Sequence, residues 1–150
     1  MQTNEILPPG ACWLTPYLTV TDAEHSLHFY SQAFGFGRGR VVPGPGGTII
    51  HAEMTYQGKT VVMFTPEGPW SPMRTPAHSG CRMPLNFYVY CANVDRLAER
   101  ARKAGAMTLA EPLDMFWGDR VVQLQDSDGY LWTFATKVGE MDLSKMPIPG

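Results

Sequence analysis

Apolar and polar residues alternate from Trp13 to Val20, a pattern that predicts a β-strand with one apolar face. Pro16 favours an edge strand or the beginning of a strand, because proline has no N–H to donate. Apolar residues then recur at helical spacing, which predicts a helix. Thr21 and Glu24 fit a capping box with Thr21 as the N-cap, and Gly35 is suited to end this helix.

Three further strands are predicted in the first half of the chain, at Gly39–Val42, Thr48–Tyr56 and Lys59–Thr65. The alternation is clearest in the second of them, where His51 and Glu53 share the more polar face. Only two residues separate the second strand from the third, so these two strands are expected to form a hairpin.

Residues 66–84 contain five prolines and show no hydrophobic period. A segment of this length without a period predicts a linker or a lid-like loop between the two halves of the chain.

The second half of the chain repeats the order of elements seen in the first. A strand is predicted at Leu85–Cys91, and a helix capped by Asn93 follows and ends at Gly105. Three more strands are predicted, the last two joined by a turn sequence: Met107–Leu113, Arg120–Gln125 and Tyr130–Thr136.

The two halves match at a nearly constant offset. Gly35 corresponds to Gly105 at 70 residues, and the turn glycine Gly58 corresponds to Gly129 at 71 residues. The predicted fold class is therefore α+β: one domain over 1–150, with βαβββ modules at 13–65 and 85–136, a Pro-rich connector at 66–84 and a tail at 137–150. Because so small a module has little core of its own, the modules are expected to share one cupped, barrel-like sheet with the helices on its outer face.

Composition narrows the possible functions. The chain has 150 residues, 44% of them hydrophobic, and its net charge of −2 argues against a nucleic-acid partner. No apolar run approaches the length of a membrane span, and no targeting signal is visible, so a soluble cytoplasmic protein is expected. The three cysteines lack Cys-x-x-Cys spacing, which argues against a disulfide framework or a structural zinc site.

Short motifs, in the same order as the predicted elements, carry a family resemblance. They are Leu18–Asp22, Phe29–Tyr30, Phe34–Phe36 and Asp126–Trp132, the last with Ser127 where proline is usual. Over residues 13–136 the chain resembles the vicinal oxygen chelate superfamily: glyoxalase I, extradiol dioxygenases, fosfomycin thiol transferases and bleomycin-resistance proteins. Further segments look like a glyoxalase-like subgroup often labelled demethylubiquinone-methyltransferase-like: Ile50–Glu53, Gly58 and Phe116–Arg120. The resemblance also implies a homodimer.

The resemblance implies where a metal would bind. Metal enzymes of this superfamily hold zinc, nickel, manganese or iron with His, Glu or Gln on the first and last strand of each module. The matching positions in this chain are Thr15, Val62, Asn86 and Thr133. None of these side chains holds a divalent ion tightly, so no metal and no cofactor is expected. A metal site that uses His51, Glu53 and His78 remains an alternative.

Other side chains are candidates for binding a small molecule. His51 and Glu53 could share a proton or bind a polar group, or they could form a solvated hydrogen-bonded pair. The aromatic residues could line a concave face or simply fill it, and Arg120 could anchor an anion or pair with Asp119 on the surface. The expected ligand-binding residues are His51, Glu53, Tyr17, Asn86, Tyr88, Trp117, Arg120 and Thr133.

The function predicted from these observations is binding of a small, aromatic or planar organic molecule in a concave cleft without the standard metal centre of the superfamily. Two alternatives remain open. One is a metal-dependent lyase, isomerase or dioxygenase, and the other is metal-free catalysis with Glu53 or His51 as general base. The sequence does not decide between an enzyme and a binding protein, because this scaffold hosts many chemistries.

Overall fold

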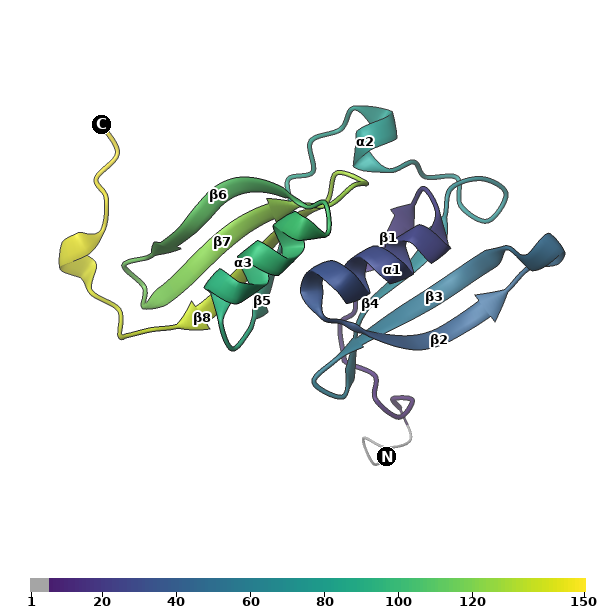
Figure 1. Ribbon diagram of the computed structural model, residues 1–150, viewed down its shortest axis with the longest axis horizontal. Coiled ribbons are helices and arrows are strands. Elements are labelled where there is room, and N and C mark those ends of the chain that lie inside the picture. The colour runs from purple at the N-terminus through teal and green to yellow at the C-terminus, as the bar shows by residue number, and fades with distance from the viewer. Residues whose placement is uncertain (1–5) are drawn as a thin grey trace. The chain divides into compact units, whose positions relative to one another are not determined.

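The computed structural model describes residues 6–150, which form two compact units. The first unit ends at Gly80 and the second begins at Cys81. Each contains a four-stranded mixed sheet with one longer helix packed against it (Figure 1). The predicted α+β class and the two βαβββ modules are confirmed. The strands hydrogen-bond in two separate sheets rather than in one shared sheet, because each sheet buries its own apolar face under its own helix.

The first unit has the strand order β1-β4-β3-β2, with β1 parallel to β4 and the other neighbours antiparallel. Its elements are β1 (Tyr17–Val20), α1 (Ala23–Phe34), β2 (Gly37–Pro43), the 3-10 turn η2 (Pro45–Gly47), β3 (Ile49–Tyr56), β4 (Lys59–Pro66) and α2 (Pro76–Ser79). The predicted hairpin of β3 and β4 is present. Its turn residues Gln57 and Gly58 have φ of 51° and 75°, as a two-residue hairpin turn requires.

The core of the first unit lies between α1 and one face of its sheet. Ala52 and Met54 of β3 and Val62 and Phe64 of β4 are all 0% exposed. The ring of Tyr30 on α1 lies 5.9 Å from the ring of Phe64, centroid to centroid. The alternation predicted for β3 is therefore confirmed, since every second side chain packs under the helix.

β1 is shorter than the sequence predicts. It begins at Tyr17 and not at Trp13. Pro16 explains the difference, because it cannot donate to the ladder of hydrogen bonds. The carbonyl oxygen of Pro16 still accepts from the N–H of Met63 at 2.9 Å, so this residue aligns β1 on β4 without extending the strand.

The cap of α1 also differs from the prediction. Asp22, and not Thr21, is the N-cap, and its Oδ1 accepts from the N–H of His25 at 2.8 Å. Glu24 does not reach back to complete a capping box; its carboxylate accepts two hydrogen bonds from Arg38, at 3.0 and 3.1 Å. The carboxylate one residue further on provides the cap that the Thr21 hydroxyl was expected to provide.

The second unit repeats the topology as β5-β8-β7-β6, with β5 parallel to β8. Its elements are β5 (Asn86–Tyr90), α3 (Val94–Lys103), β6 (Met107–Asp114), β7 (Asp119–Gln125), β8 (Leu131–Lys137) and the 3-10 turn η3 (Leu143–Lys145). Asn93 caps α3 as predicted, accepting from the N–H of Arg96 at 3.1 Å. Trp132 and Phe134 of β8 are buried on the face that packs against α3, again as predicted.

The connector is more structured than its sequence suggests. It contains the four-residue helix α2, too short to leave a hydrophobic period, with Thr75 as N-cap. Glu67 ties its ends together: Oε1 accepts from the N–H of Thr75 at 2.6 Å, and Oε2 lies 2.8 Å from Nδ1 of His78. The connector as far as Gly80 is thus part of the first unit.

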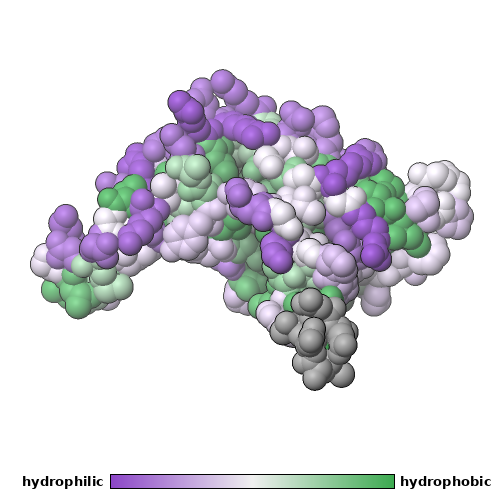
Figure 2. Space-filling view, turned by 90° about the horizontal axis from the view of Figure 1, so that it is seen from below, coloured by the Kyte–Doolittle hydropathy of each residue, from purple (hydrophilic) through white to green (hydrophobic). Residues whose placement is uncertain are grey.

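Among residues 6–150, no helix is long and apolar enough to cross a membrane. Hydrophobic and hydrophilic residues are interspersed on the surface seen in Figure 2. Large apolar side chains that are more than half exposed nevertheless occur in both units, among them Trp13, Tyr17, Trp70 and Tyr90. Exposed aromatic residues are candidates for binding surfaces.

Candidate functional site

Each sheet has one face turned away from its helix, which we call its open face. Residues opposite one another in the strand ladder share a face. On the first sheet Met63 lies opposite both Tyr17 and Glu53, so these three side chains belong to the open face. His51, two residues before Glu53, belongs to it as well.

A chain of hydrogen bonds crosses the open face of the first sheet. The hydroxyl of Tyr17 lies 2.8 Å from Nδ1 of His51, and Nε2 of the same ring lies 3.1 Å from Oε1 of Glu53. A neutral imidazole with its proton on Nε2 fits both contacts, because it accepts from the phenol and donates to the carboxylate. Three of the expected ligand-binding residues are therefore brought together.

Burial and charge keep the Tyr17 phenol protonated. Partial burial raises the pKa of Tyr17, and the negative charge of Glu53 raises it further. The side chains of His51 and Glu53 are mostly buried, with exposed fractions of 21% and 17%. The group can hold a proton and present a phenolic O–H, which is a combination suited to proton exchange with a bound molecule.

The open face of the second sheet is organised around a buried carboxylate. Asp119 is only 5% exposed. Its Oδ2 accepts from the hydroxyls of Tyr88 at 2.6 Å and Tyr90 at 2.8 Å. The indole N–H of Trp117 in turn donates to the Tyr88 oxygen at 3.1 Å. We call these four residues the Asp119 cluster.

The Asp119 cluster fixes its aromatic rings in place. The rings of Tyr88 and Tyr90 meet edge to face, with centroids 5.6 Å apart. They remain 43% and 56% exposed, so their surfaces are available to a ligand. Burial, together with the hydrogen bond to the carboxylate of Asp119, raises the pKa of Tyr88 to about 12. Both hydroxyls therefore stay protonated donors at neutral pH.

The backbone after β6 positions Trp117. Gly118 has φ of 99°, and a Cβ at this position would lie 2.5 Å from the carbonyl oxygen of Gly139. That oxygen belongs to the tail, whose residues Val138 and Gly139 both donate their N–H to the Gly118 carbonyl. Only glycine fits this close approach. The beginning of the predicted tail thus packs against the loop that carries the indole.

Asn86 and Thr133 also meet on the open face of the second sheet. Nδ2 of Asn86 donates to Oγ1 of Thr133 at 2.6 Å. Tyr88 lies directly opposite Thr133 in the ladder, so this pair adjoins the Asp119 cluster. Four of the expected ligand-binding residues thus share one face of the second unit: Asn86, Tyr88, Trp117 and Thr133.

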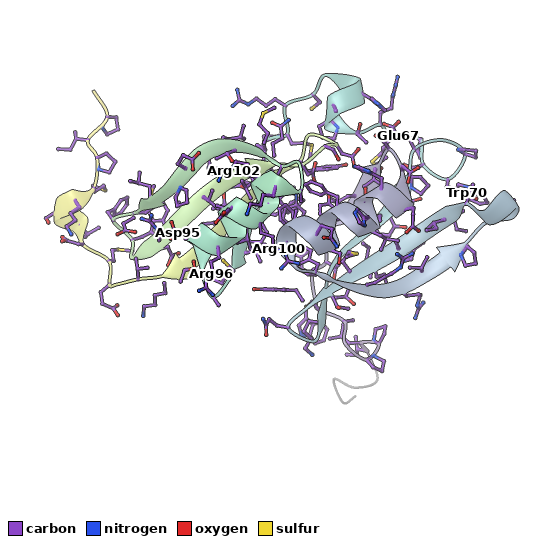
Figure 3. The ribbon with its side chains drawn as sticks, in the orientation of Figure 1. Glu67, Trp70, Asp95, Arg96, Arg100 and Arg102 are labelled. Atoms are coloured by element: carbon purple, nitrogen blue, oxygen red, sulfur yellow. The ribbon has the colours of Figure 1, made fainter. Side chains whose placement is uncertain are left out.

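Arg120 does not join that face. Its guanidinium bonds to Asp95 on α3, labelled in Figure 3, at 2.9 and 3.0 Å, and to Asp114 at 3.0 Å. The pairing with Asp119 that the sequence suggests is wrong, because neighbouring residues of a strand point to opposite faces. Arg120 holds α3 to the sheet, and Asp119 serves the tyrosines on the other side.

One position of the implied metal set needs correction. The sequence offset makes Val62 the counterpart of Thr133, but Val62 is fully buried under α1. Strand pairing gives Met63 instead, since it lies opposite Tyr17 as Thr133 lies opposite Tyr88. The offset changes from 71 to 70 residues because the loops that close the two hairpins differ in length.

The corrected positions do not fit a divalent metal. They are Thr15, Met63, Asn86 and Thr133, which offer two hydroxyls, a thioether and an amide. None of these groups is an anionic or imidazole ligand. Within residues 6–150, no group of three or more His, Cys, Asp or Glu side chains is placed to hold a metal ion. His78, the third ligand of the alternative site, bonds instead to Glu67.

Comparison with known proteins agrees with this architecture. Residues 13–134 match the family model of the Glyoxalase/Bleomycin resistance protein/Dioxygenase superfamily. The chain belongs to this superfamily. The glyoxalase superfamily resemblance expected from the sequence is confirmed, whereas the narrower demethylubiquinone-methyltransferase-like label stays a prediction.

Relatives and solved structures extend the comparison. The chain is 32% identical over 135 residues to the uncharacterized protein Mb0911c of Mycobacterium bovis, covering 89% of this chain and 88% of that one. TioX from Micromonospora sp. ML1 is 27% identical, with a TM-score of 0.66 over 83% of this chain and 98% of TioX. The fosfomycin resistance protein FosX of Listeria monocytogenes, complexed with Mn(II), matches over 87% of this chain and 90% of its own at 14% identity and a TM-score of 0.61. At that identity the likeness shows the superfamily fold alone.

Sequence reasoning missed the role of Asp119, the residue that organises the second open face. A signal was present: Tyr88 and Tyr90 share a strand face, and an acidic residue begins a neighbouring strand. Which strands are neighbours, and in which register, could not be read from the alternation itself.

Proposed function

We propose that the protein binds a small, planar, partly polar organic molecule on the open face of the second sheet, without the metal centre of its superfamily. The observation that carries this proposal is the buried Asp119 carboxylate, which fixes two half-exposed phenol rings and, through Tyr88, an indole. Rings held in this way lose little conformational freedom when a ligand stacks on them.

The chemistry of this face supports a neutral ligand. The negative charge of Asp119 is buried and accepts hydrogen bonds from two phenols, so the surface that a ligand meets is mainly aromatic. The amide and hydroxyl of Asn86 and Thr133 add polar groups beside the rings. Apolar burial would supply the affinity and these polar groups would orient the molecule.

A thermal-shift and fluorescence titration with quinoline and 7-hydroxycoumarin tests this proposal. A ligand that binds only the native state raises the melting temperature as its concentration exceeds Kd. We expect both probes to stabilise the protein in the presence of EDTA. Tyr88→Ala should abolish the effect, whereas Trp13→Phe, which changes an exposed aromatic residue outside this face, should leave it intact. Equal shifts in the native protein and in Tyr88→Ala would contradict the proposal.

The first sheet favours a second candidate, metal-free acid–base catalysis. The specific observation is the Tyr17–His51–Glu53 chain of hydrogen bonds, in which an imidazole lies between a phenol and a carboxylate. His51 would take a proton from a carbon acid and Glu53 would stabilise the imidazolium. Incubating the EDTA-treated protein with a 2-oxoaldehyde–thiol adduct in D2O tests this, since proton exchange at carbon is visible by NMR. His51→Gln should remove the exchange, and exchange that persists in this variant would exclude His51 as the base.

A metal-dependent lyase, isomerase or dioxygenase is the competing proposal. It requires a stoichiometric metal in protein purified without an affinity tag, and loss of that metal in Glu53→Ala. We expect elemental analysis to find neither.

We also propose that the chain forms a homodimer, as the family resemblance implies. Sedimentation equilibrium measures this directly, with a mass of twice 16.7 kDa as the expected result and a mass of 16.7 kDa as the contrary one.

A further inference from the structure

A pocket of about 680 Å³ lies in the first unit and takes none of its lining from the hydrogen-bonded chain of Tyr17, His51 and Glu53. Three segments form it: the beginning of α1, the η2 turn with the two residues after it, and the chain from Pro66 to Trp70. Its volume suits a small molecule.

The walls of the pocket are largely apolar. Pro45, Pro66 and Pro69 line it together with Ile49 and the indole of Trp70. The indole is 51% exposed, although burial of so large an apolar side chain is normally favourable. Figure 3 shows Trp70 in the segment that follows β4, close in sequence to Glu67. An exposed indole at the wall of a pocket is the kind of residue that dominates binding energies.

Trp70 is held in position by its neighbours. A turn forms between Gly68 and Ser71, with the N–H of Ser71 donating to the Gly68 carbonyl at 3.2 Å. The Ser71 hydroxyl lies 3.2 Å from the hydroxyl of Thr19, and both of these residues are buried. The turn is thereby anchored to β1, and the indole beside it has a fixed place.

The pocket carries negative charge. Asp22, Glu24 and Glu67 line it, and none of its described lining residues is Lys, Arg or His. Asp22 and Glu24 offset the partial positive charge that the helix dipole places at the N-terminus of α1. Glu24 is paired with Arg38 and Glu67 with His78, both from outside the lining. Hydrogen bonds from the Thr75 N–H and from His78 lower the pKa of Glu67, so its carboxylate is ionised at neutral pH.

We propose that this pocket binds an organic cation, an ammonium compound with apolar substituents, whose charge lies against the indole of Trp70 and near the carboxylate of Glu67. The ring face attracts a cation electrostatically, and the prolines pack against its apolar substituents. An anion would be repelled by the carboxylates, and a neutral compound would gain only the apolar contacts. The site is separate from the open faces and is independent of the proposed function.

A matched pair of probes tests the charge requirement: choline and its neutral carbon isostere 3,3-dimethylbutan-1-ol. The two have the same shape, so they differ only in the charge that the pocket is expected to recognise. Indole resonances in an NMR titration report binding, and Trp70→Leu assigns the Trp70 signal. We expect choline to bind about tenfold more tightly than the alcohol, with the preference shrinking as salt is added.

Variants decide which residues make the preference. Trp70→Leu should remove it, and Glu67→Gln should weaken choline binding, while Trp13→Leu, a change at an indole that does not line the pocket, should alter neither. Circular dichroism checks that each variant is folded. Equal affinities for the two probes, an unchanged preference in Trp70→Leu, or an unchanged affinity in Glu67→Gln would each overturn the proposal.

Discussion

In the first unit the hairpin of β3 and β4 closes over Gln57 and Gly58, whereas in the second unit β7 and β8 close over a loop organised by Asp126. The carboxylate of Asp126 is buried and accepts from the N–H groups of Asp128 and Tyr130 and from the indole of Trp132, at 2.9 to 3.0 Å. The same topology is thus closed by backbone conformation in one unit and by a buried side chain in the other.

The open faces differ in a parallel way. Tyr17 and Tyr88 occupy matching places, opposite Met63 and Thr133. The Tyr17 hydroxyl meets an imidazole, whereas the Tyr88 hydroxyl donates directly to a buried carboxylate. The first face is therefore suited to moving a proton and the second to holding rings still. The packing under the helices limits divergence, and the open faces are free to acquire different chemistry.

The largest expected effect concerns the hairpin loops. Asp126→Ala leaves three donors without their acceptor, including the buried indole N–H of Trp132, and should cost about 3 kcal/mol of unfolding free energy. Gln57→Ala in the matching turn should cost less than about 0.5 kcal/mol. Urea unfolding followed by tryptophan fluorescence measures both. Similar costs for the two variants would mean that the loops do not differ as described.

The matched tyrosines should separate next. Tyr88→Phe removes one of the two hydrogen bonds from tyrosine to Asp119 and the acceptor of the Trp117 indole, and should cost about 1.5 kcal/mol. Tyr17→Phe removes a contact that is open to solvent and should cost about 0.5 kcal/mol or less. Unfolding of the two variants under one set of conditions gives the comparison. A larger cost for Tyr17→Phe would reverse it.

The pH dependence of Tyr88 gives a smaller effect. Its pKa is raised from 10.0 to about 12, so the folded state favours the protonated phenol. The stability that this contributes is complete below pH 10 and is lost as the pH rises through 12. Ultraviolet titration should show a tyrosine step near pH 12 that disappears in Tyr88→Phe and moves downward in Asp119→Asn. A step that stays in place in Asp119→Asn would remove the carboxylate as a cause.

The smallest effect is expected from ion pairs that hold helices to the sheets. Arg120 bonds to two carboxylates, and its side chain is 32% exposed; Arg38 bonds to one, and its side chain is 52% exposed. Exposed pairs contribute little because water and salt screen them. Thermal unfolding of Arg120→Gln and Arg38→Gln should show the larger decrease for Arg120→Gln, with the difference shrinking as salt is added. No difference at low salt would contradict the described contacts.

Much of the fold could be predicted from alternation alone. The period of two placed Ala52 and Met54 under the helix, and His51 with Glu53 on the opposite face, because a buried face tolerates few polar residues. The helix α2 left no period to detect, and the cap at Asp22 depended on which of two adjacent residues makes the hydrogen bond. Element type was therefore more predictable than element boundaries.

The site was less predictable because it depends on register. Asp119 and Arg120 are adjacent in sequence yet serve opposite faces, one bound to tyrosines and the other to Asp95. The difference of one residue between the hairpin loops was enough to substitute Val62 for Met63 in the implied metal set. Partners on neighbouring strands follow from loop lengths and bulges, which the hydrophobic pattern does not record.

The central claim is that the rings of the Asp119 cluster bind a planar molecule without a metal. A calorimetric titration of 7-hydroxycoumarin into protein kept in EDTA, compared with protein supplied with Zn²⁺ or Mn²⁺, tests it most directly. The account predicts saturable binding with the same affinity in all three solutions. Binding that is absent in EDTA and restored by either metal would contradict it.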